Sequence, residues 1–133
     1  MSNDTATLVT DTGFRPDDWK TGFETPDTDG PLNAIELAPD SDVHALKAQL
    51  DDIEIIRIQF PSFADGRGFT LARRLRAMGY QGRMRAAGHV LADQYAMARR
   101  SGFDEVQIDA ALAARQPEAQ WRARANWREN DYL

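Results

Sequence analysis

The stretch that decides the fold is IEIIRIQF at residues 53–60, followed by PSFADGRGF at residues 61–69. The first part is apolar at nearly every position, which is typical of a buried strand in a parallel sheet. The second part contains Pro, Asp, Arg and two Gly, and a helical pattern then runs from Leu71 to Met78. A strand that enters a glycine-rich turn at a helix start is where open α/β sheets place their ligands.

The same pattern repeats further along the chain. A second unit starts with a strand at residues 83–87, and both helices end in arginine, then Gly, then an aromatic residue, at 76–80 and 99–103. Arginine suits the negative end of a helix, Gly adopts a positive φ just after it, and the aromatic residue packs back on the last turn. Further strands are expected at 32–37 and 104–108, and further helices at 43–50 and 109–115.

Alternating strands and helices predict an α/β fold with a small, mostly parallel sheet of repeated βα units. Two architectures remain open. One is an open flavodoxin-like sheet, which we favour, and the other is half of a βα barrel, whose exposed edge favours a homodimer. Within an irregular N-terminal extension, residues 6–10 resemble a short strand. The expected organisation is this extension packed on the core, a βα-repeat domain, and a C-terminal helix with a loosely held tail, at residues 1–31, 32–116 and 117–133.

Composition restricts the classes of function. The chain has 133 residues, enough for one domain, and 42% hydrophobic and 28% charged residues indicate a soluble globular protein. No apolar run approaches the roughly 20 residues of a membrane span, and no secretory signal opens the sequence, so a cytoplasmic location is expected. Cysteine is absent, which excludes disulfides, thiolate nucleophiles and cysteine-held iron–sulfur clusters. Redox chemistry would therefore need a bound cofactor or a partner, and the residues identify no cofactor.

Charge is distributed unevenly. Residues 1–60 carry 4 Lys and Arg against 13 Asp and Glu, and residues 61–133 carry 12 against 8, which gives −5 for the whole chain. The basic second half suits a small anion, whereas the acidic total argues against a nucleic-acid partner. Two His residues without Cys argue against a metal site.

The turns after residues 60 and 87 are expected to meet, because the carboxyl ends of parallel strands share one edge of the sheet. At the helix start, the backbone N–H groups of Gly66, Arg67 and Gly68 suit an anion that Arg67 grips with two hydrogen bonds. The alternative is that Asp65 caps the helix, the glycines only form the turn, and Arg67 is solvated. Leu71 stands where a dinucleotide fingerprint has its third Gly, and a Walker lysine is absent.

Asp65, His89 and Asp93 are the candidates for catalysis. His89 would act as a general base, with Asp93 four residues later orienting it, and the alternative is a helix cap or a surface hydrogen bond. Because two arginines on one covered strand face are costly to bury alone, we favour ion pairs within the fold for Arg83 and Arg85. The predicted rim of the site is completed by Gly88, Gln94 and Arg85.

Two motifs, FPSFADGRGF at residues 60–69 and RAAGHVLADQ at residues 85–94, resemble those of a bacterial family of unknown function, domain of unknown function 934. The match spans residues 6–108. Members of this family commonly carry the label of an oxidoreductase associated with sulfite reduction. Shorter similarities lie at LVTD, LAPD and RSGFD, residues 8–11, 37–40 and 100–104.

The resemblance implies an accessory protein of assimilatory sulfite reduction, which binds the reductase, its electron donor or a small oxyanion. The alternative is an enzyme, an oxidoreductase acting on a small anionic substrate at Asp65, Arg67 and Asp93, with flavin as the cofactor to consider. The resemblance carries no cofactor and no catalytic residue over to this chain. The family often has a small or acidic residue at the position of His89, which argues against a general base there.

Overall fold

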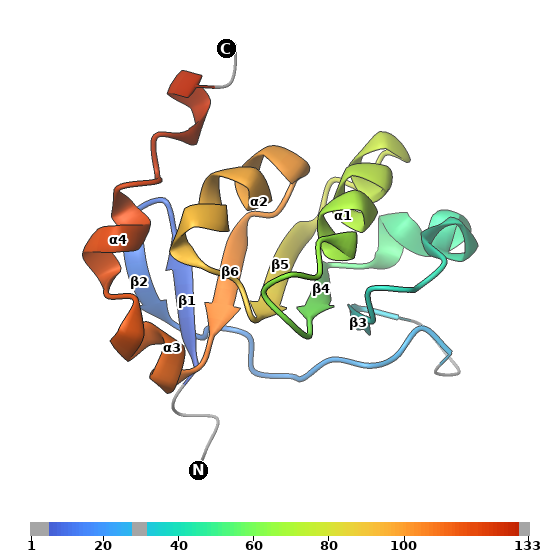
Figure 1. The fold of residues 1–133 in the computed structure, drawn as a ribbon. Helices are drawn as coiled ribbons and strands as arrows, with labels where there is room; N and C mark the ends of the chain where they lie inside the picture. The colour runs from blue at the N-terminus through green and yellow to red at the C-terminus, as the bar shows by residue number, and fades with distance from the viewer. Residues whose placement is uncertain (1–5, 28–31, 131–133) are drawn as a thin grey trace.

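A six-stranded sheet forms the centre of the computed structural model, which describes residues 6–27 and 32–130 (Figure 1). In spatial order the strands are β2 (Gly13–Pro16), β1 (Thr7–Thr10), β6 (Glu105–Ile108), β5 (Arg83–Gly88), β4 (Ile55–Phe60) and β3 (Ala34–Leu37). The α-helices are α1 (Arg67–Ala77), α2 (Tyr95–Ser101), α3 (Ala110–Arg115) and α4 (Glu118–Arg122). The 3-10 helices are η2 (Val43–Asp52), η3 (Ala92–Gln94) and η4 (Trp127–Asn130).

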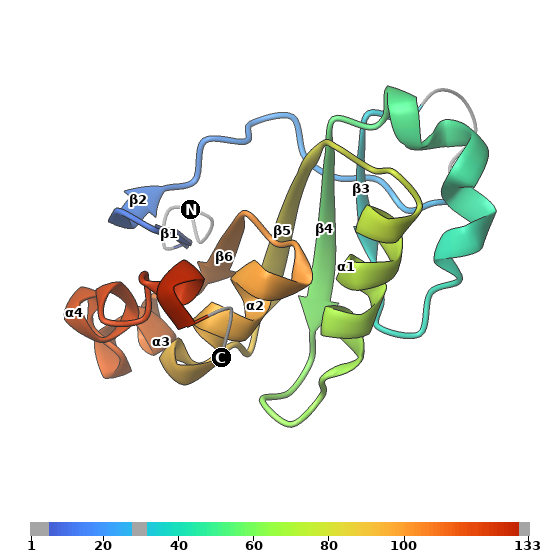
Figure 2. The same cartoon turned by 90° about the horizontal axis from the view of Figure 1, so that it is seen from above.

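The strands from β3 to β6 are parallel and follow one another in sequence order, whereas β1 is antiparallel to β2 and β6. Right-handed crossovers that always step to the same side bring their helices onto one face of a sheet. Accordingly, α1 and α2 both lie over the same face, above the sheet in Figure 1 and on the viewer's side of it in Figure 2. The predicted α/β class is confirmed, and the described strands form an open, mostly parallel sheet.

The two faces of the sheet differ in character. Ile56, Ile58 and Phe60 of β4 belong to the hydrophobic core under the helices. Arg57 and Gln59 alternate with them and therefore point to the opposite face. The strand register extends this polar face across the neighbouring strands, where it carries Arg83, Arg85, Glu105 and Gln107.

The segment after β2 covers part of the polar face, below the sheet in Figure 1. Arg85 donates to Asp17 across 3.0 Å, and the Arg57 guanidinium lies 3.9 Å from the centre of the Phe23 ring. Glu24 then runs along β3, where its N–H donates to the carbonyl of Ala34 at 2.9 Å. Part of the β3 edge is thus already paired, and the homodimer expected for a free edge stays a prediction.

Both repeated units end as predicted. Gly79 and Gly102 have φ of 101° and 118°, in the left-handed region that favours glycine. The N–H groups of the next residues, Tyr80 and Phe103, reach back to the carbonyl five residues earlier at 3.0 Å. These are Schellman-type helix ends, and both aromatic side chains are buried.

Three elements differ from expectation. Residues 43–52 form a 3-10 helix rather than an α-helix, and the turn after β1 leads into a second strand, β2. The C-terminal segment is not loose at Trp127, whose indole N–H donates to Asp11 at 3.3 Å, while residues 131–133 lie outside the described part. In the described ranges, no helix combines the length and apolar character that crossing a membrane requires.

Candidate functional site

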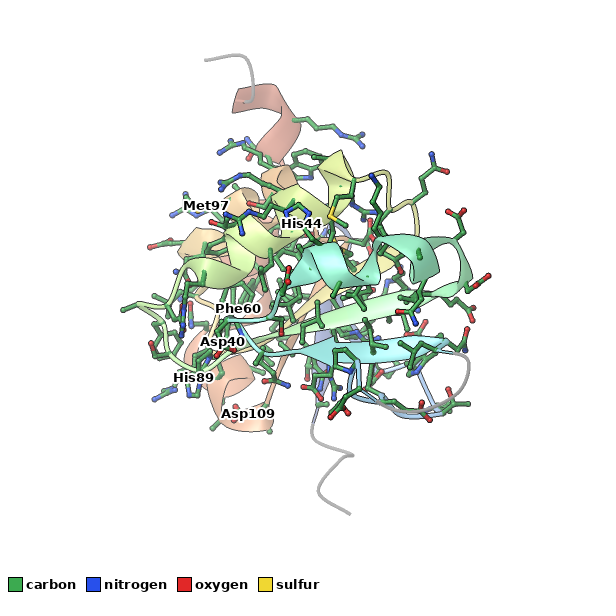
Figure 3. All side chains as sticks on the ribbon, turned by 90° about the vertical axis from the view of Figure 1, so that its right-hand side faces the viewer. Asp40, His44, Phe60, His89, Met97 and Asp109 are labelled. Atoms are coloured by element: carbon green, nitrogen blue, oxygen red, sulfur yellow. The ribbon has the colours of Figure 1, made fainter. Side chains whose placement is uncertain are left out.

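The turns after β4 and β5 meet at one end of the sheet. The His89 N–H donates to the carbonyl of Phe60 at 2.9 Å, and the His89 ring meets the Phe63 ring edge-on with centroids 5.1 Å apart. The side-chain amide of Gln94 donates to the carbonyl of Phe63 at 3.1 Å. Figure 3 shows His89 at this end together with Phe60, Asp40 and Asp109.

The helix start at Gly66 is already occupied by a carboxylate of the chain. Asp65 accepts hydrogen bonds from the Arg67 backbone N–H at 3.1 Å and from its guanidinium at 3.0 and 2.7 Å. The side-chain hydrogen bond from Arg67 is the main reason that the pKa of Asp65 falls to about 2. A negative charge therefore sits at the positive end of α1 without a ligand. An external anion at Gly66, Arg67 and Gly68 stays a prediction, in competition with Asp65.

Two glycines of the predicted site have packing reasons of their own. A Cβ on Gly68 would lie 2.6 Å from the Phe60 ring, and a Cβ on Gly88 would lie 2.7 Å from the Phe60 carbonyl oxygen. Gly88 also has φ of 116°. Close approach and backbone geometry thus explain both residues without a ligand.

The other predicted residues are engaged within the fold. Asp93 forms an ion pair of 2.7 Å with Arg124, and no hydrogen bond to His89 is seen in the described structure. Gln94 also accepts from the Leu91 N–H at 2.8 Å. Arg85 lies further back along β5, fully buried, and binds Glu105 at 2.7 Å. Asp65 and Asp93 are therefore both ion-paired carboxylates.

A hollow of about 260 Å³ lies beside Arg67, between α1 and the loop after β3. Arg74 lines it as well, together with Asp40 and Ser41. The pKa of Arg67 is raised by its hydrogen bond to Asp65, by the charge of Asp65 and by that of Asp40. These carboxylates compensate Arg67, whereas Arg74 has no ion pair with any described residue, so one uncompensated guanidinium lines this hollow.

A second cavity lies on the polar face at the carboxyl ends of the strands. The strand order never reverses between β3 and β6, so the crevice that a reversal opens in doubly wound sheets has no counterpart there. Instead, a space of about 250 Å³ opens between the sheet and α3. Its lining residues are Ala6, Arg57, Gln59, Ala87, Gly88, His89, Gln107, Ile108, Asp109, Leu112 and Arg115.

Hydrogen-bond donors dominate this cavity. The Gln107 side-chain oxygen accepts from Arg57 at 3.3 Å and from Arg85 at 3.0 Å, which turns its NH₂ group away from both guanidiniums. Within the described residues, neither Gln59 nor Arg115 has a side-chain hydrogen bond or ion pair. The cavity therefore combines two guanidiniums with amide donors.

Among the described residues of the lining, Asp109 is the one carboxylate, and the backbone holds it. It caps α3 by accepting from the Leu112 N–H at 2.8 Å. Arg57 is partly compensated by Glu36, at 2.9 Å, and stacks on Phe23, whereas Arg115 is exposed. The lining thus contains two guanidiniums and one carboxylate, and the guanidinium without an ion pair among the described residues, that of Arg115, favours an anionic group.

Sequence reasoning identified His89 and Gly88 of this lining but missed Arg57, Gln59, Gln107 and Arg115. A signal was present in the strands: Arg57 and Gln59 occupy alternate positions of β4, which places polar side chains on one face. Arg115 carries no such signal, because its position depends on where α3 lies relative to the sheet.

No curated protein matches the chain. A family model does match, over residues 34–130, and that range includes β3 to β6 and most of the cavity lining. The matching family is described as "Bacterial protein of unknown function (DUF934)". Since the match covers well over half of the sequence, the chain belongs to this family.

Proposed function

We propose that this chain is an accessory protein of assimilatory sulfite reduction and that it binds a small oxyanion in the cavity between the sheet and α3. The resemblance of its motifs to proteins labelled for sulfite reduction supports the pathway. The excess of guanidinium and amide donors over the one capped carboxylate supports the ligand class. A cytoplasmic location fits this role, and the partner would be the reductase or its electron donor.

The observation that carries the ligand class is the state of Arg115. This side chain lines the cavity, is exposed, and makes no ion pair with any described residue. A guanidinium at the mouth of a donor-lined cavity can form two parallel hydrogen bonds with a carboxylate, sulfate-type or phosphate-type group. Arg57 lines the same cavity and supplies a second guanidinium, which Glu36 partly compensates.

A binding role fits the residues better than the oxidoreductase alternative at Asp65, Arg67 and Asp93. The first two residues are bonded to each other, and Asp93 is bonded to Arg124. The hydrogen bond from Arg67 lowers the pKa of Asp65, so this carboxylate is a poor general base near neutral pH. Absence of cysteine leaves any electron transfer to a bound cofactor or to the partner.

The test is calorimetric titration of the purified protein with sulfite, sulfate and acetate at constant ionic strength, with chloride as the reference anion. Arg115→Gln should weaken binding about tenfold or more, because it removes a charge-assisted hydrogen-bond donor. Arg122→Gln, on the exposed side of α4, is the matched control and should bind as the wild type does.

The pathway is tested separately, in a bacterium that lacks the gene and is grown on sulfite as its sulfur source. The wild-type gene and the Arg122→Gln variant should restore growth, and the Arg115→Gln variant should not. If no oxyanion binds more tightly than chloride, the proposed ligand class is wrong. If Arg115→Gln restores growth fully while its binding is lost, the cavity has no part in sulfite reduction.

A further inference from the structure

The cavity is larger than an inorganic oxyanion requires. Its volume of about 250 Å³ corresponds to about eight water molecules, at roughly 30 Å³ each. A tetrahedral ion such as sulfate would displace only about two or three of them on the same scale. Most of the space would stay filled with water, and the guanidinium contacts would remain exposed to it.

The cause of this space is a small residue between two long ones. The register places Gln59, Ala87 and Gln107 side by side on the polar face of three adjacent strands. Side chains on the outer two strands extend away from the sheet, whereas Ala87 has only a methyl group and leaves room between them. Two residues earlier on β4 and β5, Arg57 and Arg85 pair on the same face, and their long side chains fill the space there. The hollow therefore begins at Ala87.

The lining is polar on one side and apolar on the other. Arg57, Arg115 and the two glutamines supply charge and amide groups. Ala87 and Leu112 line the same cavity and are each 4% exposed, so they offer it a small hydrocarbon surface. An inorganic anion has no group that gains from such a surface, whereas a short hydrocarbon body does.

We infer that the ligand of this cavity is a small organic anion, whose oxyanion group meets the guanidiniums and whose short carbon body lies against Ala87 and Leu112. This inference rests on the proposed function, because it assumes that the cavity binds an oxyanion. The oxyanion group is a sulfonate, a carboxylate or a phosphate monoester, all of which accept two parallel hydrogen bonds from arginine. The Gln59 carboxamide makes no hydrogen bond to any described residue, so it can bond to one polar substituent on the carbon body.

The experiment is a calorimetric series at constant ionic strength. The probes are sulfate and sulfite, then methane-, ethane- and propane-1-sulfonate, then acetate to butyrate, and finally phosphate and propyl phosphate. Affinity should rise about fourfold for each added methylene, hence about tenfold or more from methanesulfonate to propane-1-sulfonate. The series that binds most tightly identifies the oxyanion group.

Ala87→Leu fills the hollow. It should weaken the binding of the organic anions about tenfold, while the affinity for sulfate changes by less than about threefold. Ala77→Leu, at an exposed position on α1, is the matched control. Ala87→Val is a smaller filler for the case in which the leucine variant unfolds. Arg115→Gln should weaken the binding of both inorganic and organic anions.

The outcomes separate this inference from the proposed function. If sulfate and sulfite bind at least as tightly as every organic anion, and Ala87→Leu changes none of them, the inference is wrong and the oxyanion site stands. If no anion of either kind binds above chloride, the oxyanion site itself is wrong, and the inference fails with it.

Discussion

Arg85 is buried completely, although it carries a charge at every physiological pH. Its guanidinium binds Glu105 at 2.7 Å, Asp17 at 3.0 Å and the Gln107 oxygen at 3.0 Å. Two of these partners, Glu105 and Gln107, come from β6, and Asp17 comes from the segment after β2. A single side chain therefore ties the N-terminal segment to the middle of the sheet, and its hydrogen bonds compensate the loss of water.

Removing Arg85 should destabilise the protein, because Glu105 would remain buried with less compensation of its charge. In Arg85→Met, Glu105 stays buried with only Arg83, at 2.9 Å, to compensate it. We expect the free energy of unfolding to fall by about 3 kcal/mol, the lower end for breaking a buried ion pair, because Arg83 remains. Urea unfolding at neutral pH measures this change.

The double substitution Arg85→Met with Glu105→Leu is the control for that experiment. It removes the buried charge together with its partner, so most of the lost stability should return. If the single substitution costs less than about 1 kcal/mol, the ion pair is not what holds the N-terminal segment to the sheet.

Asp11 holds the β1–β2 turn to α2 and η4. Burial raises its pKa, but hydrogen bonds from Arg99, Tyr95 and Trp127 lower it more, so the pKa lies below the ordinary 3.8. A carboxyl with a lowered pKa stabilises the fold fully above its unfolded pKa and loses that contribution as the pH falls below it.

Asp11→Asn should therefore destabilise the protein most at neutral pH and progressively less below pH 3.8. We expect about 1 kcal/mol at pH 7, a modest value because the carboxylate is partly exposed and screened. Urea unfolding at pH 7 and pH 3 gives the two values, with Asp51→Asn, an exposed carboxylate of η2, as the control for loss of charge. A constant difference at both pH values would contradict the hydrogen-bonded carboxylate.

At the level of elements, the sequence predicts best what is local. The ends of α1 and α2 could be predicted because Gly79 and Gly102 follow arginine-rich turns, and this geometry depends on only a few neighbouring residues. The strand β2 could not be predicted, since it pairs only with β1, which in turn pairs with β6 about a hundred residues away. Residues 43–52 have helical spacing, but periodicity does not separate an α-helix from a 3-10 helix in a ten-residue segment.

In the candidate site, too, the features that depend on long-range packing could not be predicted from the sequence. The meeting of the turns at Phe60 and Gly88 follows from parallel strands alone, and the structure places these turns together. The cavity could not be predicted, because it requires knowing which face of the sheet the helices leave uncovered. Only the polar alternation at Arg57 and Gln59 pointed to that face, and the contribution of α3 depends on long-range packing.

The helix α3 links folding to the electrostatics of the cavity, because Asp109 both caps this helix and lines the cavity. Asp109→Ser keeps a hydroxyl acceptor for the Leu112 N–H and removes the negative charge. Binding of an oxyanion should therefore tighten by several-fold, about threefold to tenfold, with little change in stability.

Asp109→Ala is the matched variant for that prediction. It removes the same charge but also the cap, so the free energy of unfolding should fall by about 1 kcal/mol. The binding of the oxyanion should tighten as much as in Asp109→Ser. Calorimetry and urea unfolding on the same preparations separate the two effects. Weaker anion binding in the serine variant would mean that Asp109 itself contacts the ligand.

Across the whole molecule, charge is distributed unevenly, and the layer formed by α1 and α2 is positive. The chain carries −5, yet α1 and α2 together contain six arginines and no carboxylate. Some of these arginines are used within the fold: Arg76 binds the carbonyl of Gly102 at 2.8 Å, and Arg99 binds that of Phe103. Arg73 and Arg74 are exposed on α1 and have no ion pair with any described residue. The outer side of the helix layer is thus positive, on the face of the sheet opposite to the cavity.

This arrangement leads to a prediction about the partner of the proposed accessory role. If sulfite reductase or its electron donor presents an acidic surface to α1, association should be fast at low salt and should weaken as ionic strength rises. Arg73→Glu with Arg74→Glu should reduce affinity at least about tenfold, mostly through a slower association rate. Arg122→Glu, on α4, changes charge elsewhere and should have little effect. Biolayer interferometry with each purified candidate partner measures both rates. Equal association rates for the two charge variants would exclude the helix layer as the docking surface. The proposal of an anion cavity would not be affected by that result.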